Sequence, residues 1–336
     1  MCTLLLVLLS SPAIWAASDG NTWAYTGQNG EDKWPTKFGF CGAVYQSPLD
    51  FHKNILQYDS TLLPVKLYGY NASSTDMFTV SNNGHTASVA LLPSMQMDIP
   101  PFRYIASHLH FHWGNLASPK GSEHCIEGKR FAAELHIVHY NSKYADVATA
   151  MDAADGLAVL GILIEAGFFN PAYEKIFSQF GNVRYKDQKV EIAGFDVREL
   201  IPKRLDEYYR YEGSLTTPPC NPSVLWTVFR EPVLISEEQL KSLETALYCT
   251  DRNSSVPVEM INNFRRLQHE GDRLVLVSFR EGVVLAVVLA SILCVVVATG
   301  IICWLFHCRR RSKDRGEKKN VMYTAAVTSE ENTSKV

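Results

Sequence analysis

The sequence predicts a mostly β domain with short peripheral helices, followed by one membrane-spanning helix near the C-terminus. Strand-like segments dominate residues of about 20 to 280, and helix signals there are few. The 24 residues from Val283 to Phe306 contain no charged side chain, and this length is enough to cross roughly 30 Å of hydrocarbon.

Four segments carry the clearest strand signals. They are Tyr104–Trp113 and Ala133–His139, which alternate, Leu157–Ile164, which is continuously apolar, and Val224–Phe229, which is β-branched and aromatic. Alternation is typical of a strand with one buried face, whereas a continuous apolar run is expected of a strand buried on both faces.

Helix signals are confined to two places. Ser236-Glu-Glu-Gln239 has the pattern of a capping box, and Leu240, Leu243 and Leu247 follow on one helical face. Pro171 could open a second helix that runs through Phe180. Both helices are expected at the periphery of the sheet.

The two ends of the chain indicate how it meets a membrane. Leu4–Leu9 is a short apolar run that precedes small residues at Ala16–Ser18, which is typical of a secretory signal peptide, with a buried first strand as the alternative. Basic residues follow the apolar span at once, which places that side in the cytoplasm. We therefore expect a signal peptide at 1–17, an extracellular domain at 18–280, a transmembrane helix at 281–306 and a disordered cytoplasmic tail at 307–336, as in a single-pass type I plasma-membrane protein.

The composition excludes several classes of protein. With 46% apolar and 20% charged residues, the chain is neither collagen-like, wholly disordered nor a coiled coil. Its net charge is −3, so nothing overall indicates a nucleic-acid partner.

A group of histidines indicates a metal site. His110 and His112 lie two apart on a predicted strand, so their side chains share a face, with Cα atoms roughly 6.5–7 Å apart. This motif alone is weak, since two unrelated core or surface histidines are the alternative. His136 on the next strand supplies a third imidazole, and Glu134 on the same face can hold its tautomer. Three neutral histidines leave a fourth position open on Zn²⁺, as in catalytic sites, where the bound water can ionise near neutral pH.

Together with further motifs, these residues resemble the α-class carbonic anhydrases in order and spacing. The matching motifs are Gln46–Pro48, Ser81–His85, His110–Trp113, Gly121–His124, Ala133–His136 and Gly213–Pro219. The resemblance covers residues of about 21 to 280 and is strongest to the single-pass, membrane-bound type. It implies an α-carbonic-anhydrase-like fold, with a large, twisted, predominantly antiparallel central sheet. It also implies a lyase for reversible hydration of CO₂ to bicarbonate and a proton, by attack of zinc-bound hydroxide, in pH and bicarbonate homeostasis.

The resemblance assigns roles to individual residues around the metal. His110, His112 and His136 match the zinc ligands, Glu134 the partner of the third ligand, Thr216 and Glu123 the pair that orients the hydroxide, and His85 the proton shuttle. Val138, Val159, Leu215, Val224 and Trp226 match the apolar wall where CO₂ rests, Thr217 a second polar pocket residue, and Tyr25, Asn83 and Ser88 the residues that order water.

His108 departs from the family pattern, which usually has Gln at this position to accept a hydrogen bond from the first zinc ligand. A neutral imidazole can also accept, but with a different geometry. Because His108 lies two residues before His110, the alternative is that it is itself a ligand. His124 and His139 are expected to be hydrogen-bonded core groups.

The resemblance also bears on the cysteines, the glycans and the partners. It implies a Cys41–Cys220 disulfide, while Cys125 and Cys249 are either buried thiols or a second bond. Asn71 and Asn253 are extracellular glycosylation sequons. Beyond the lipid bilayer, the expected partners are a second copy of the chain and bicarbonate or proton transporters.

Two alternatives of other classes remain. A zinc hydrolase is one, because zinc hydroxide can also attack esters. A catalytically inactive binding module on the same fold is the other, although the chain keeps every expected ligand.

Overall fold

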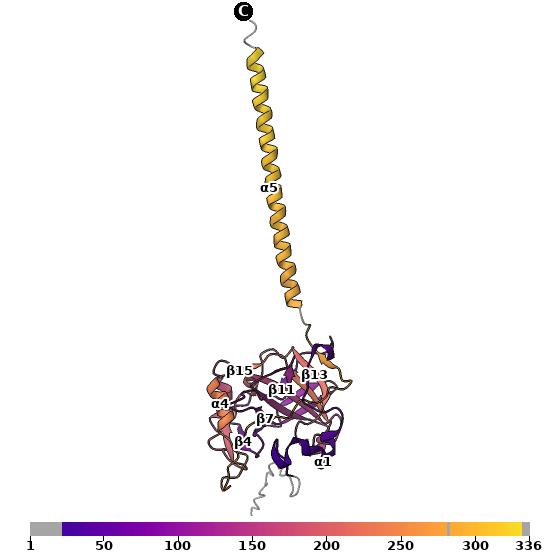
Figure 1. Cartoon of the computed structure of the whole chain (residues 1–336), viewed down its shortest axis with the longest axis vertical. Helices are drawn as coiled ribbons and strands as arrows, with labels where there is room; N and C mark the ends of the chain where they lie inside the picture. Colours follow the sequence, from indigo (N-terminus) through magenta and orange to yellow (C-terminus); the bar gives the residue numbers. More distant parts are fainter. Residues whose placement is uncertain (1–21, 281–282, 331–336) are drawn as a thin grey trace, which may run out of the picture. The chain divides into compact units, whose positions relative to one another are not determined.

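The computed structural model describes residues 22–280 and 283–330, which form two compact units that meet between Phe279 and Arg280 (Figure 1). Each unit is considered by itself. The predicted signal peptide at 1–17 lies outside the described residues.

The first unit is built on a large sheet. Its strands are β2 (Leu56–Tyr58), β3 (Lys66–Tyr68), β4 (Met77–Asn82), β5 (Ala87–Ala90), β6 (Gln96–Ile99), β7 (Phe102–Trp113), β10 (Ala133–Asn141), β11 (Leu157–Ala166), β12 (Lys189–Ala193), β13 (Tyr208–Gly213), β14 (Val224–Phe229), β15 (Val233–Ile235) and β16 (Val275–Val277). A small second sheet consists of β1 (Asp50–Phe51), β8 (Cys125–Ile126) and β9 (Lys129–Arg130).

Within the described residues, the main path through the large sheet is β12-β4-β5-β7-β10-β11-β14-β13-β16-β2. Most neighbouring strands are antiparallel, and the exceptions are the parallel pairs β11–β14, β11–β15 and β16–β2. The predicted mostly β domain with a predominantly antiparallel sheet is therefore confirmed.

Short helices surround this sheet, as predicted. The α-helices of the first unit are α1 (Trp34–Lys37), α2 (Val147–Met151), α3 (Pro171–Phe177) and α4 (Glu237–Thr245), and the 3₁₀ helices are η1 (Gly27–Asn29), η2 (Glu31–Lys33), η3 (Gly39–Gly42), η4 (Lys53–Ile55) and η5 (Val197–Leu200). The capping box at Ser236 and Gln239 is present. Helix α3 ends at Phe177 rather than Phe180, because tighter turns take over there: Phe180 donates its N–H to the carbonyl of Phe177.

Alternation along β7 and β10 separates a core face from a site face. Leu109 and Phe111 of β7 and Ile137 of β10 are buried in the larger hydrophobic core. Side chains of successive strand residues point to opposite faces, so the intervening histidines project from the other face. Strand β11 is buried on both faces, as its continuous apolar sequence predicts, with Leu160 in one core and Val159 in the other.

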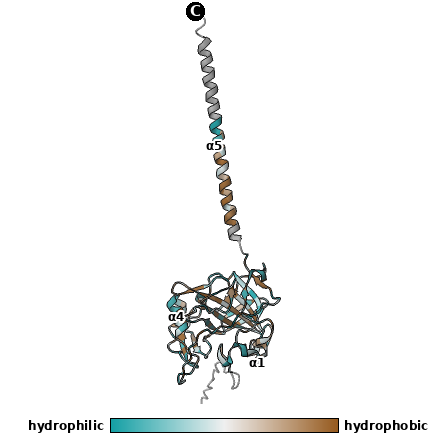
Figure 2. Cartoon of the chain, in the orientation of Figure 1, coloured by the Kyte–Doolittle hydropathy of each residue, from teal (hydrophilic) through white to brown (hydrophobic). Residues whose placement is uncertain are grey.

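The second unit is the single helix α5 (Val283–Glu330). Its apolar part is long enough to cross a membrane at Val287–Arg311, and Figure 2 shows the apolar stretch giving way to a hydrophilic one. The expectation of a disordered tail after residue 306 is wrong for residues 307–330, which continue the helix. No proline interrupts this stretch, so nothing in it removes a helical hydrogen bond.

Candidate metal centre

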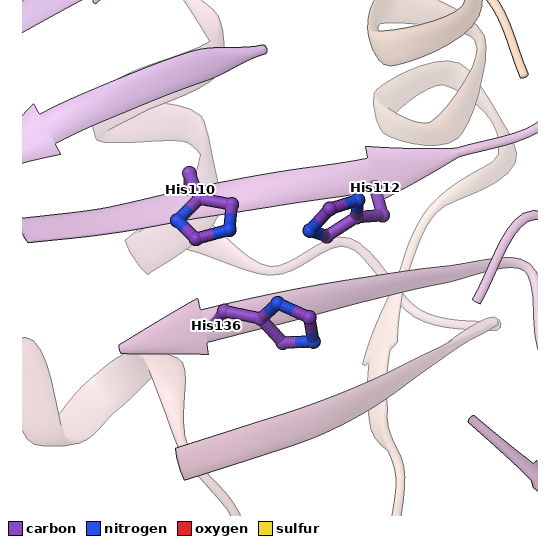
Figure 3. Close-up of side chains that lie close together, drawn as sticks. All are labelled: His110, His112 and His136. Atoms are coloured by element: carbon purple, nitrogen blue, oxygen red, sulfur yellow. The ribbon is translucent and has the colours of Figure 1, made fainter. Parts of the chain in front are cut away.

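Strands β7 and β10 bring the three predicted ligands together. His110 and His112 project from β7, and His136 from the neighbouring β10, where it lies directly opposite His110 (Figure 3). One nitrogen from each ring lies within 4.8 Å of one from each of the others. The ring centroids are 4.5–5.2 Å apart. Two-residue spacing on one strand and direct pairing with the next account for this convergence.

Hydrogen bonds fix the orientation of two of these rings. His112 Nδ1 lies 2.7 Å from the carbonyl oxygen of Asn263, which can only accept, so this nitrogen carries the proton. Its Nε2 is buried and has no hydrogen-bond partner among the described residues. His136 Nε2 lies 2.8 Å from Glu134 Oε1, which leaves Nδ1 facing the other rings. His112 Nε2 and His136 Nδ1 can therefore each present a lone pair to the space between the three rings.

The surroundings of His110 and His112 favour their neutral form. Burial, followed by the neighbouring His112, His136 and His108, lowers the pKa of His110 well below its ordinary value. Burial also lowers the pKa of His112. Neutral imidazole is the form that binds a metal ion. Three convergent imidazoles, two of them with lowered pKa values, therefore fit a three-histidine zinc site with an open position.

A second cluster of possible ligands is better explained as a hydrogen-bond network. His124, Glu134 and His136 also lie within ligand distance of one another. However, both ring nitrogens of His124 already have partners, Glu134 Oε1 at 2.7 Å and the Tyr211 hydroxyl at 2.6 Å. Although burial opposes it, the neighbouring His124 and His136 hold the pKa of Glu134 well below its usual range. His124 thus helps to hold Glu134 in place, and Glu134 in turn orients His136.

Glu123 lies beside the metal centre and is fully buried. Its Oε1 accepts from the backbone N–H of Arg265 at 2.8 Å, and its Oε2 has no hydrogen-bond partner among the described residues. Thr216 is also buried, and the described part of the chain contains no hydrogen bond between its hydroxyl and Glu123. The Glu123 carboxyl also lies beside two of the proposed ligands, with Oε1 3.5 Å from His112 Nδ1 and Oε2 3.9 Å from His136 Nδ1.

The predicted apolar wall consists of side chains that share one hydrophobic core. Val138, Val159, Val224 and Trp226 are buried in this core, and Leu215 packs against it. The Trp226 ring meets that of His136 edge-on, with centroids 4.8 Å apart. The wall and the three histidines are thus adjacent.

A cleft of about 1390 Å³ opens over the centre. It is lined by His110 and His112 together with the following predicted site residues: Tyr25, Asn83, His85, Ser88, His108, Val138, Leu215 and Thr217. The metal-facing side of the cleft is therefore connected to the residues expected to order water.

His85 is held at the side of this cleft. Its ring stacks on Trp23, with centroids 3.8 Å apart and planes 8° apart. Burial, together with the nearby Lys186, lowers its pKa to about 4. Asn83 stabilises the turn before His85, because its side-chain oxygen accepts from the His85 and Thr86 N–H groups. Ser88 of β5 lies opposite His110 of β7. Burial raises the pKa of Tyr25 well above its ordinary value.

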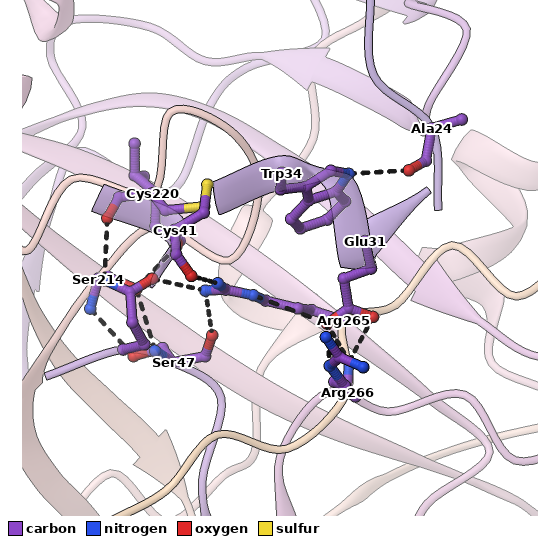
Figure 4. The surroundings of a disulfide bond; sticks show 11 residues. Ala24, Glu31, Trp34, Cys41, Ser47, Ser214, Cys220, Arg265 and Arg266 are labelled. Atoms are coloured by element: carbon purple, nitrogen blue, oxygen red, sulfur yellow. Dashed lines mark hydrogen bonds and ion pairs between the residues drawn. A yellow bond between two sulfur atoms is a disulfide. The ribbon is translucent and has the colours of Figure 1, made fainter. Parts of the chain in front are cut away.

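The predicted disulfide is present between Cys41 and Cys220 (Figure 4). It ties the N-terminal segment to the loop that follows Thr216. Arg265 supports the same junction by donating to the carbonyl oxygens of Cys41 and Ser47 at 2.9 Å. The sequence leaves open whether Cys125 and Cys249 form a second disulfide. In the structure both are unpaired thiols.

Asn263 and Arg265 are functional residues that the sequence does not identify. Toward the metal centre each contributes a backbone group: the Asn263 carbonyl accepts from His112, and the Arg265 N–H donates to Glu123. The segment that carries them has no regular secondary structure and lies about 150 residues from its partners. No local pattern marks such contacts.

Comparisons with known proteins agree with this geometry. Residues 29–279 match the family described as eukaryotic-type carbonic anhydrase. Human carbonic anhydrase 12 is 50% identical over 97% of this chain and 95% of its own length. Canine carbonic anhydrase 6 is 38% identical over 82% of this chain and 86% of its own length, and the human carbonic anhydrase 6 is 38% identical over 76% and 83%. The chain therefore belongs to the eukaryotic-type carbonic anhydrase family and is a carbonic anhydrase.

Proposed function

We propose that the chain hydrates CO₂ reversibly at the outer face of the plasma membrane, using zinc held by His110, His112 and His136. The observation that carries this proposal is the convergence of three imidazoles, two of them oriented by hydrogen bonds from the opposite ring nitrogen. When bound, a zinc ion would act as a Lewis acid that lowers the pKa of a coordinated water to about 7.

Around this centre, Glu134 and the carbonyl of Asn263 hold two ligand rings in their metal-binding tautomers. Thr216 is proposed to donate its hydroxyl proton to the free Oε2 of Glu123. The threonine oxygen can then only accept, which orients the attacking water toward the substrate.

The apolar wall is proposed as the resting place of CO₂. A small nonpolar molecule gains little from hydrogen bonds, and a dry surface favours it over water. Val138 and Val159 face one another on β10 and β11, so their size limits the space beside His136. Thr217 adds a polar group at the cleft side.

His85 is proposed to carry the released proton to bulk water, along water ordered by Tyr25, Asn83 and Ser88. While stacked on Trp23, its pKa of about 4 makes it a weak acceptor at pH 7. Turning the ring into the water-filled cleft would return the pKa toward about 6.5, where uptake and release are both efficient. We therefore infer that the shuttle works from the solvated orientation.

Three sequence features and the exposed sequons support the proposed location. The predicted signal peptide, the apolar stretch of α5 and the basic residues after it favour a single-pass chain with an extracellular catalytic domain. Asn71 and Asn253 are both exposed and available for glycosylation. Dimerisation and transporter partners stay predictions of the resemblance.

The metal site is tested by zinc content of the full-length chain in detergent. One zinc per chain is expected for the wild type, with strongly reduced binding in His110→Ala, His112→Ala and His136→Ala. His52→Ala is the matched control, because His52 does not line the cleft and its half-exposed ring pairs with Asp50, at 3.2 Å. Retention of zinc by all three site variants would contradict the assignment.

A further inference from the structure

The three proposed ligands differ in how their second nitrogen is satisfied. The non-ligating nitrogen of His112 is paired with the Asn263 carbonyl, and that of His136 with Glu134. His110 Nδ1, by contrast, is buried and has no hydrogen-bond partner among the described residues. Among the described residues, His110 therefore lacks the hydrogen bond that orients each of the other two rings.

The His108 ring packs against the His110 ring. Both lie on the same face of β7, and their rings stack with centroids 5.3 Å apart and planes 27° apart. Nearly parallel rings present their faces to one another rather than a nitrogen lone pair to an N–H group. His108 Nδ1 is instead 3.2 Å from the Ser107 hydroxyl. His108 thus packs against His110 without accepting its proton.

We propose that His108 positions His110 by ring stacking alone, so that the chain holds zinc less tightly than its three-histidine donor set allows. This inference rests on the proposed zinc site. When Nε2 of His110 binds a cation, Nδ1 must carry the ring proton. A buried donor without an acceptor opposes that state. Supplying an acceptor at position 108 should therefore tighten zinc binding.

The test is competition for zinc between the full-length chain and a colorimetric chelator. His108→Gln places an amide oxygen on a side chain of similar reach, and it should lower the dissociation constant for zinc about 10- to 100-fold, the range typical of ligand-orienting partners. His108→Leu fills similar space without an acceptor and should not tighten binding. His52→Gln makes the same substitution at an exposed site and should leave the dissociation constant unchanged.

The outcomes separate this inference from the proposed function. If the wild-type chain binds no zinc, the proposed function fails and the inference falls with it. If the wild type binds zinc but His108→Gln does not bind it more tightly, or His108→Leu tightens it equally, the inference is wrong and the zinc site stands.

A measurement on the wild type keeps the inference testable should a variant misfold. In the zinc-loaded chain with ¹⁵N-labelled histidine, the Nδ1 proton of His112 should resonate downfield, as expected of a hydrogen-bonded imidazole. That of His110 should lie clearly upfield of it. Equal downfield positions for the two protons would show that His110 has an acceptor and would overturn the proposal.

Discussion

Glu134 joins two histidines with different tasks. Its Oε2 accepts from the His124 N–H at 2.8 Å, and its Oε1 lies 2.7 Å from His124 Nδ1 and 2.8 Å from His136 Nε2. Although burial opposes ionisation, the flanking His124 and His136 hold the pKa of Glu134 well below its usual range, so the carboxylate remains ionised and accepts from both rings. One carboxylate therefore supports a ligand and a core residue together.

Replacing this carboxylate should weaken metal binding. Glu134→Gln keeps the shape but removes the charge and one acceptor position. We expect zinc affinity to fall about 10- to 100-fold, measured by chelator competition. Glu199→Gln is the matched control, since Glu199 is exposed and pairs with Lys175 at the surface. Unchanged affinity in Glu134→Gln would show that the carboxylate does not hold the ligand.

His139 shows how a buried histidine outside the metal centre affects stability. It is fully buried, with Nε2 bonded to the Tyr70 hydroxyl and Nδ1 3.2 Å from the Ala158 carbonyl. Burial lowers its pKa to about 4. The unfolded chain binds this proton below about pH 6.5, so the contribution to stability is present above that pH and is lost as pH falls toward about 4.

The lowered pKa of His139 therefore predicts how the free energy of unfolding depends on pH. Between pH 7 and pH 5 the free energy of unfolding should fall by about 2 kcal/mol on account of His139. His139→Gln should make that decline smaller by a similar amount, although it lowers stability at both pH values. The measurement is urea unfolding of the metal-free chain at each pH. An identical decline in the variant would contradict the assignment.

At the scale of the secondary-structure elements, strands set by a local sequence pattern could be predicted, whereas contacts between distant segments could not. The strands β7, β10, β11 and β14 are foreseen because alternation and β-branched runs are local signals. The histidine triad follows from two-residue spacing and direct strand pairing. The support from Asn263 and Arg265 could not be predicted, because contacts from an irregular segment so far along the chain carry no sequence signature. The stacking of His85 on Trp23 likewise depends on how the N-terminal segment folds back.

The Cys41–Cys220 bond should stabilise the junction between the N-terminal segment and the loop after Thr216. It links residues 179 apart in sequence, and closing so long a loop restricts the unfolded chain strongly. Removing it in a Cys41→Ser, Cys220→Ser double variant should lower the free energy of unfolding by about 3–5 kcal/mol.

Urea unfolding with and without reductant checks this prediction. The wild type should lose stability on reduction, and the double variant should not respond. Cys125→Ser and Cys249→Ser provide the control, since both residues are unpaired thiols and their variants should keep the wild-type response. Equal stability of reduced and oxidised wild type would show that the bond does not stabilise the fold.

At the scale of the whole molecule, the proposed orientation can be tested through glycosylation. The exposed sequons at Asn71 and Asn253 belong to the catalytic unit, whereas Asn332 follows the apolar helix and lies outside the described residues. Expression in mammalian cells should give two N-linked glycans. Asn71→Gln and Asn253→Gln should each remove one, measured as a mobility shift after enzymatic deglycosylation. A glycan on Asn332, with none on the other two, would reverse the orientation.

The alternative of a catalytically inactive binding module is excluded by membership of the enzyme family together with the intact triad. An ester hydrolysis at the same centre stays a prediction. The buried apolar side chains of Val138, Val159 and Trp226 would favour a small nonpolar substrate.

The three histidines are proposed to form a zinc centre that hydrates CO₂. The most direct test is stopped-flow CO₂ hydration by the full-length chain in detergent, with zinc content measured on the same sample. We expect fast turnover at one zinc per chain, lost in His112→Ala together with the metal. Folded wild-type chain with neither zinc nor turnover, or full turnover in the metal-free variant, would contradict this proposal.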